Sequence, residues 1–127
     1  MKYILDVNAL VAMHHANHPF HKRFHAWASG LAAWQFFSCA ISDLGFIRIS
    51  MAGYNYRLET ARGTLEAVKR ASVTGYIDAL PPPKLARWVA SHKHTTDAYL
   101  CQLAATNGMK LATFDTSIKD TAAFLIP

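Results

Sequence analysis

Two short runs of strand-forming residues, Lys2–Leu5 and Lys110–Phe114, each end directly on an aspartate. Such a run, stopped by a polar residue, is typical of a buried β-strand that leaves the core at a turn. Between the two runs lie segments with helical apolar spacing, such as Phe20, Phe24 and Trp27. Strands that alternate with helices predict an α/β fold with a mostly parallel sheet, because parallel strands are joined by crossover connections.

The rest of the chain continues this alternation. Further strands are predicted at Trp34–Ala40, Gly75–Leu80 and Phe124–Ile126. Helices are predicted from Asn8 and from Pro19, from Ser42 as N-cap to Met51, over Leu58–Val68, around Leu85–Val89, and from Thr95 or Thr96 to Asn107. With 127 residues, of which 52% are apolar and 17% charged, the chain has material for one core, so we expect a single domain over residues 1–127.

The lengths of the apolar runs indicate the expected compartment. No apolar run approaches the roughly 20 residues of a membrane span, and Asp6 comes too early in the chain for the apolar region of a signal peptide. We therefore expect a cytoplasmic protein with no membrane partner. Cys39 and Cys101 lie among apolar residues without Cys-x-x-Cys spacing, which predicts buried free thiols. The net charge of +5 fits an anionic partner, but a small basic protein needs no such partner, and charge alone leaves both readings open.

Four of the eight acidic residues are expected on one rim of the sheet. Asp6 and Asp115 follow strands, while Asp97 and Asp43 begin helices, and helices that follow parallel strands begin at the same carboxyl edge, where such sheets bind ligands. Singly, each position has an ordinary explanation as a turn or cap residue. Gathered together, carboxylates repel one another unless a cation neutralises them, and a set of hard oxygen ligands favours Mg²⁺ or Mn²⁺.

At these residues the sequence resembles the PIN-domain family, and in particular the VapC-type toxins of bacterial toxin–antitoxin pairs. The matching segments are Leu5–Leu10, Asn17–Trp27, Ile41–Arg48, Thr96–Leu100 and Leu111–Asp115. They fall in order over nearly the whole chain. The resemblance implies a three-layer α/β/α ribonuclease fold that uses Mg²⁺ or Mn²⁺ to cut RNA, is held inactive by a cognate antitoxin, and forms a homodimer.

Carried over by position, the resemblance makes Asp6, Asp97 and Asp115 metal ligands. Asn8 and Thr113 become supporting polar groups that orient carboxylates or water. The family's second acidic position is usually Glu, and here it is Asp43, which would also belong to the catalytic group. Because its side chain is shorter by about one C–C bond, we expect Asp43 to hold metal only through water.

Several other residues carry weaker signals. His14, His18, His21 and His25 have zinc-like spacing, but Asn17–Pro19 breaks the helix between them, so packing and capping are expected for them. Arg48 lies about one turn beyond Asp43 and is the best candidate to contact RNA phosphate or an acidic antitoxin. Tryptophans on apolar faces are expected in core or dimer packing; they are Trp27, Trp34 and Trp88.

The prediction is therefore a metal-dependent endoribonuclease that acts as the toxin of a toxin–antitoxin pair. One alternative is a catalytically inactive PIN fold that serves in binding or oligomerisation, which the departure at Asp43 keeps open. The other is a Mg²⁺-binding phospho-receiver module. That module would carry an acidic pair near the first strand and a lysine after the last, whereas Asp6 has no acidic neighbour and Lys119 is poorly placed.

Overall fold

Strands and helices alternate along the chain in the computed structural model, which describes residues 1–127. The strands are β1 (Tyr3–Leu5), β2 (Phe36–Cys39), β3 (Gly75–Ile77), β4 (Lys110–Thr113) and β5 (Ala123–Leu125). The α-helices are α1 (Val7–His14), α2 (His21–Ala28), α3 (Ala40–Tyr54), α4 (Leu58–Ser72) and α5 (Thr95–Thr106). Two short 3-10 helices, η1 (Ala33–Gln35) and η2 (His92–His94), precede β2 and α5.

The five strands form one sheet in the order β3-β2-β1-β4-β5, and every neighbouring pair is parallel. The predicted parallel sheet is therefore confirmed. β1 lies at the centre, with Tyr3 opposite Phe36 of β2 on one side and Lys110 of β4 on the other. Because all strands point the same way, the residues that follow β1 and β4 emerge side by side at the carboxyl edge of the sheet.

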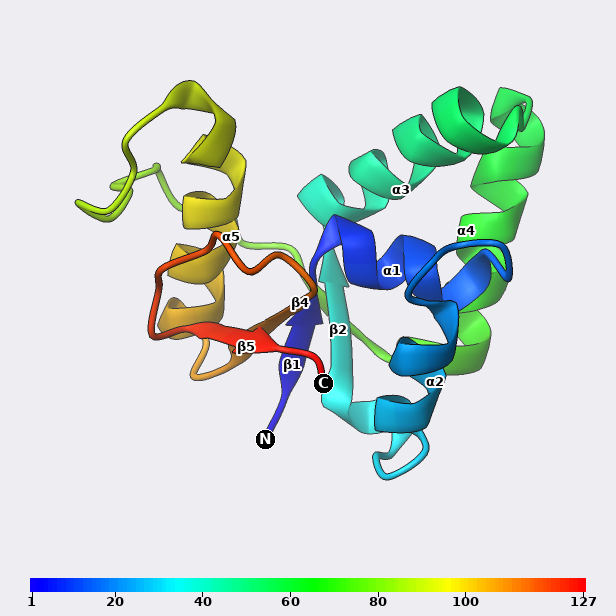
Figure 1. Cartoon of the computed structure of the whole chain (residues 1–127), viewed down its shortest axis with the longest axis horizontal. Coiled ribbons are helices and arrows are strands. Elements are labelled where there is room, and N and C mark those ends of the chain that lie inside the picture. Colours follow the sequence, from blue (N-terminus) through cyan, green and yellow to red (C-terminus); the bar gives the residue numbers. More distant parts are fainter.

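Helices cover both faces of the sheet, which gives three layers: α1 to α4 lie on one side and α5 on the other (Figure 1). Alternate residues of β1 supply the two cores, as the period of two in a strand requires. Leu5 packs with Leu10 and Phe24 on the side of α1 and α2. Ile4 packs with Leu100 on the side of α5. The three-layer α/β/α architecture is thus confirmed.

The segment before β2 differs from the predicted strand. Its first residues form η1, and β2 begins only at Phe36. Trp34 is 58% exposed, so of its two predicted roles core packing is wrong, while packing in a dimer stays a prediction. Trp27, by contrast, packs edge-on against Tyr3 with ring centroids 5.0 Å apart. The indole of Trp88 donates a hydrogen bond to Asp120 Oδ2 at 2.9 Å.

The helix predicted around Leu85–Val89 does not form, and residues 81–90 run as a loop with one turn. Three consecutive prolines lack the backbone N–H groups that a helix needs. Leu85 has a φ of +52°, which no right-handed helix contains. The backbone N–H groups of Lys84 and Leu85 instead donate to the side-chain oxygen of Gln102, at 2.9 and 3.3 Å.

Two helix boundaries also differ from the prediction. α3 begins at Ala40 with Cys39 as the extended preceding residue, so Ser42 lies inside the first turn and is not the N-cap. The helix continues beyond Met51 to Tyr54 and ends where Asn55 takes a left-handed conformation, with a φ of +57°. β3 is shorter than predicted and stops at Ile77.

The histidines after α1 serve mainly as caps and packing groups, as predicted. The His21 Nδ1–H donates to the Ala12 carbonyl at 2.7 Å, and the His25 Nε2–H donates to the Met13 carbonyl at 2.8 Å. Both therefore satisfy carbonyls of the last turn of α1. No three histidine, cysteine or acidic side chains are arranged to hold a metal ion as they stand.

Both cysteines are buried free thiols, which confirms that prediction. None of the helices combines the length and the apolar character that crossing a bilayer requires.

Candidate functional site

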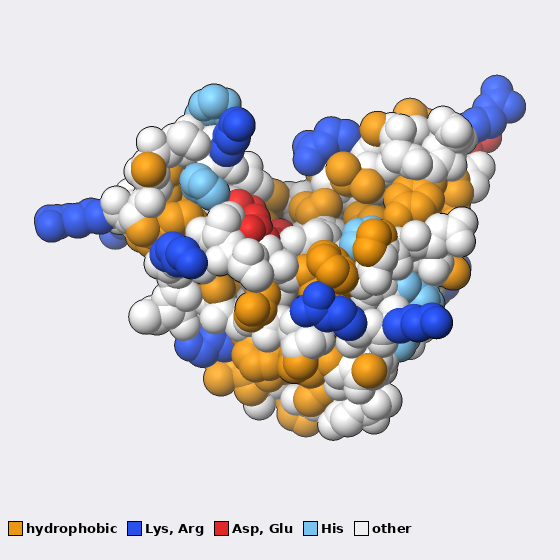
Figure 2. All heavy atoms as spheres, in the orientation of Figure 1, with side chains coloured by type: hydrophobic (Ala, Val, Ile, Leu, Met, Phe, Trp, Pro, Cys, Tyr) orange, Lys and Arg blue, Asp and Glu red, His pale blue; other side chains and the backbone are white.

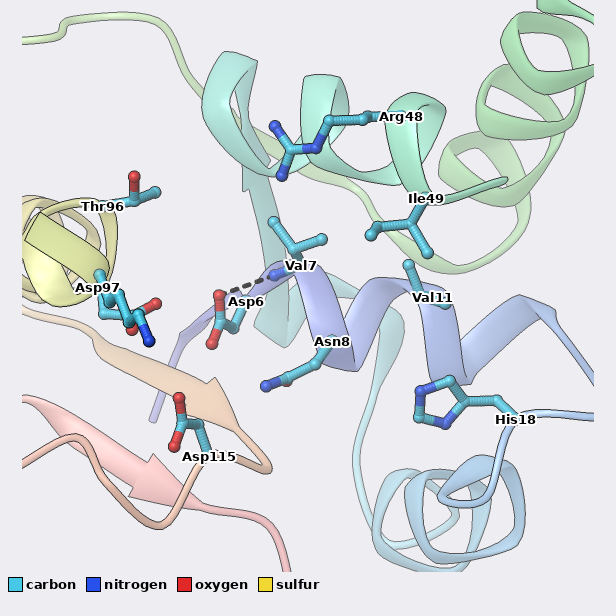
Figure 3. A pocket seen from close by; sticks show the side chains of 11 residues that line it. Asp6, Val7, Asn8, Val11, His18, Arg48, Ile49, Thr96, Asp97 and Asp115 are labelled. Atoms are coloured by element: carbon cyan, nitrogen blue, oxygen red, sulfur yellow. Dashed lines mark hydrogen bonds between the residues drawn. The ribbon is translucent and has the colours of Figure 1, made fainter. Parts of the chain in front are cut away.

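A cleft of about 410 Å³ opens at the carboxyl edge of the sheet, and three carboxylates lie on its floor (Figure 3). They come from three elements that are distant in sequence. Asp6 follows β1 and caps α1, Asp97 lies in the first turn of α5, and Asp115 follows β4. The parallel order β1–β4 brings the first and third together, and the crossover through α5 brings the second beside them.

A hydrogen-bond network holds Asp6 in place. The Thr113 hydroxyl donates to Asp6 Oδ2 at 2.7 Å, and the Val7 N–H donates to Asp6 Oδ1 at 2.8 Å. Thr113 Oγ1 in turn accepts from Asn8 Nδ2 at 3.2 Å and from the Asp115 N–H at 3.0 Å. The hydroxyl therefore uses its one proton and both lone pairs, and it links the carboxylate of Asp6 to the backbone N–H of Asp115 through a single buried atom.

Asn8 connects the first turn of α1 to the end of β4. Its amide oxygen accepts from the Phe114 N–H at 3.2 Å while its amide nitrogen donates to Thr113. The carboxylate of Asp115 is held by Ser117: its Oδ1 accepts hydrogen bonds from the N–H and the hydroxyl of Ser117, at 2.8 and 2.6 Å. Of the two polar residues singled out in the sequence, Thr113 thus bonds the Asp6 carboxylate directly, and Asn8 supports Thr113.

Burial and mutual repulsion raise the pKa of two of the carboxyl groups. Burial raises the pKa of Asp6, which is 4% exposed; the bonds from Thr113 and Val7 partly offset this rise, and the charge of Asp115 adds to it. Burial, followed by the charges of Asp6 and Asp115, raises the pKa of Asp97 to about 6. The three carboxylates therefore share one electrostatic environment that disfavours their combined negative charge.

The donor set of this floor fits a divalent cation of the Mg²⁺ or Mn²⁺ type. It consists of carboxylate oxygens, the ligands that these hard ions prefer. No lysine or arginine forms an ion pair with any of the three aspartates; the one charged contact is His94 Nδ1, 3.9 Å from Asp97 Oδ2. A cation would relieve the repulsion that raises the pKa of Asp97.

Cationic side chains line the walls above this floor. Arg48 approaches from α3 and Lys93 from η2; both are exposed, and neither is in an ion pair. Figure 2 shows the acidic floor within a hollow that has Lys and Arg side chains on both rims. α3 comes close enough because Gly45 has no side chain: a Cβ there would collide with Val7.

The fourth predicted acidic residue, Asp43, does not line the cleft. Its Oδ2 accepts a hydrogen bond from Lys69 Nζ of α4 at 2.6 Å, and the two side chains are 14% and 27% exposed. Lys69 Nζ also lies 4.5 Å from the ring centroid of Tyr76 in β3. Asp43 and Lys69 therefore connect α3, α4 and the sheet edge.

We expect Lys69→Met to lower the free energy of unfolding by about 1–3 kcal/mol, because it leaves the carboxylate of Asp43 half-buried without its cation. Asp43→Asn should cost less, since the partly exposed Lys69 ammonium can turn to water. Chemical denaturation of both single variants and the double variant should give a coupling of about 1 kcal/mol, with Lys22→Met as an exposed control. Additive single effects would show that the pair contributes nothing.

Sequence reasoning missed Lys93 and His94 as members of the site. The available signal was the basic run His92–His94 directly before the helix that carries Asp97. His18, for which packing and capping are predicted, accepts a hydrogen bond from the Phe20 N–H at its Nδ1 at 3.0 Å and also lines the cleft.

Fold and site together define an α/β protein with a carboxylate cleft at the carboxyl edge of a parallel sheet. The chain matches the PIN domain over residues 3–123 and belongs to the PIN-domain family. The resemblance seen in its ordered motifs is thereby confirmed.

Known relatives align over almost the whole chain. It is 35% identical to Ribonuclease VapC44 of Mycobacterium tuberculosis, in an alignment that covers 96% of this chain and 92% of the relative. It is 28% identical to Ribonuclease VapC39 of the same organism, with coverage of 97% and 95%, and 28% identical to Ribonuclease VapC38, with coverage of 91% and 86%.

Proposed function

We propose that this protein is a metal-dependent endoribonuclease that acts as the toxin of a toxin–antitoxin pair in the cytoplasm. The observation that carries the proposal is the floor of the cleft, where Asp6, Asp97 and Asp115 converge from three elements without a balancing lysine or arginine. The ribonuclease names of relatives that align over nearly the whole chain support the same activity.

In this proposal Asp6, Asp97 and Asp115 hold Mg²⁺ or Mn²⁺. Such an ion, when bound, would supply Lewis-acid activation of the phosphodiester and of water. Thr113 and Asn8 keep Asp6 and the Asp115 loop in place before any ion arrives. The ion pair with Lys69 favours a supporting role for Asp43 in catalysis, outside the direct ligands.

The walls of the cleft favour RNA as substrate. Arg48 and Lys93 offer unpaired positive charge on two sides of the carboxylates, where phosphates that flank the scissile one would lie. The same cationic walls would receive acidic residues of a cognate antitoxin, which we propose as the second partner. A homodimer completes the proposed assembly, by analogy with the family.

The test is cleavage of structured RNA by the purified protein. We expect cleavage with Mg²⁺ or Mn²⁺, loss of cleavage with excess EDTA, and recovery when the metal is restored, because in this proposal the bound ion supplies the activation of water. Gel electrophoresis of a varied RNA set would record the products. Intact RNA under all metal conditions would favour the alternative, a PIN fold that only binds partners.

A further inference from the structure

A second cavity, of about 450 Å³, adjoins the carboxylate cleft. The two share Thr96, which directly precedes Asp97 in α5 and lines the cleft in Figure 3. The walls of this second cavity are mostly apolar and come from three places: Ile41 in α3, Leu80 and Leu85 in the loop after β3, and Tyr99 in α5. We call it the side pocket.

The loop wall of the side pocket is fixed by side chains of α5. The Tyr99 hydroxyl donates to the Pro81 carbonyl at 2.6 Å, and Gln102 Nε2 donates to the Pro82 carbonyl at 3.1 Å. The other end of the Gln102 amide accepts from the Lys84 N–H. Consecutive prolines with restricted φ make this wall stiffer still. A pocket whose shape is held in advance can discriminate between ligands.

Leu85 adds backbone strain at this wall. Its φ of +52° lies in the left-handed region, which is strained for a residue with a bulky side chain. The conformation is maintained by the bond of its N–H to Gln102, and its side chain lines the side pocket. Such strain is concentrated at functional sites, where it positions a side chain that an ordinary turn would not place there.

We propose that the side pocket binds one nucleobase of the RNA strand, next to the scissile phosphate, and so determines which sequence is cut. This inference rests on the proposed ribonuclease function. A nucleotide has an apolar base face beside a charged phosphate, and the structure offers the matching pair: an apolar pocket that shares Thr96 with a cleft whose walls are cationic. The cleft itself contains no Phe, Tyr or Trp against which a base could stack.

The experiment uses an RNA that the protein cleaves, remade with a single abasic nucleotide at each position near the cut. We expect one position where loss of the base lowers kcat/KM by about 10-fold or more. In Leu85→Gly this penalty should shrink below about 3-fold, while kcat/KM on the abasic RNA stays at the wild-type value. Glycine accepts the positive φ, so this variant should fold with an unchanged or raised Tm.

Ile41→Ala tests the opposite wall, and Leu58→Ala, an exposed leucine outside the side pocket, is the matched control that should keep the full penalty. A photoreactive base at the sensitive position should crosslink to the segment with Leu85 or to Tyr99, with metal chelated. A penalty that persists in both pocket variants, or none at any position, would overturn the proposal and leave an apolar peptide as the better occupant. If no RNA is cleaved or crosslinked, the ribonuclease function itself fails, and this inference fails with it.

Discussion

Asp6→Asn is expected to abolish metal-dependent RNA cleavage, by at least about 10³-fold, which corresponds to about 4 kcal/mol of transition-state stabilisation. Asp6 is the most buried of the three carboxylates and lies at the centre of their network. An amide in its place removes one negative charge from the metal centre and turns a donor-free ligand into one that presents N–H groups. Turnover of RNA under saturating Mn²⁺ is the measurement.

The fold of this variant should remain intact, with Tm within a few degrees of wild type. Asparagine is as good an N-cap as aspartate, and the repulsion with Asp115 disappears. Against this gain, the new amide would face Thr113 Oγ1, whose lone pairs already accept from Asn8 and Asp115. The two effects oppose each other.

Asp78→Asn is the matched control, since Asp78 is exposed and lies outside the cleft. It should cleave RNA like the wild type. Cleavage by Asp6→Asn within 10-fold of wild type would contradict the role proposed for the floor of the cleft, whatever the stability of the variant.

The floor of the cleft was predictable because each of its parts is encoded locally. An apolar run that stops at an aspartate, as at Asp6 and Asp115, indicates both a strand and the point where it ends. The parallel topology then brings the ends of the two strands together. The first helical turn that carries Asp97 follows from the apolar spacing of α5. These signals need no knowledge of distant contacts.

The loop of the side pocket and the contact of Asp43 were not predictable, for the opposite reason. The loop that contains Leu85 takes its shape from Gln102, 17 residues further along, and Asp43 is oriented by Lys69, 26 residues away. Neither sequence separation matches the repeat of a helix or a strand, so no local pattern indicates these contacts. Local patterns around Leu85 favour a helix, and only the hydrogen bonds of the folded chain override that preference.

The metal-free protein should lose stability as the pH rises through the range from about 4 to about 6, because of Asp97. Its folded pKa, about 6, lies above the ordinary value of 3.8. The stabilising contribution of the neutral carboxyl is therefore complete below about pH 4 and is lost as the pH passes the folded pKa. Asp6, whose pKa is also raised, acts in the same direction.

Asp97→Asn isolates this effect. At pH 7.5 without metal, the variant should be more stable than wild type by about 1 kcal/mol, after allowance for solvent screening, which raises the Tm by about 3–6 °C. At pH 4 the two should melt together, because both side chains are then uncharged. Mn²⁺ at 100 times its Kd should stabilise the wild type by about 2.7 kcal/mol and the variant far less, so that their order reverses. The measurement is thermal unfolding at the two pH values, with and without Mn²⁺. A variant that gains as much stability from Mn²⁺ as the wild type would show that Asp97 is not a metal ligand. A direct carboxylate ligand cannot be replaced by an amide without loss of metal affinity.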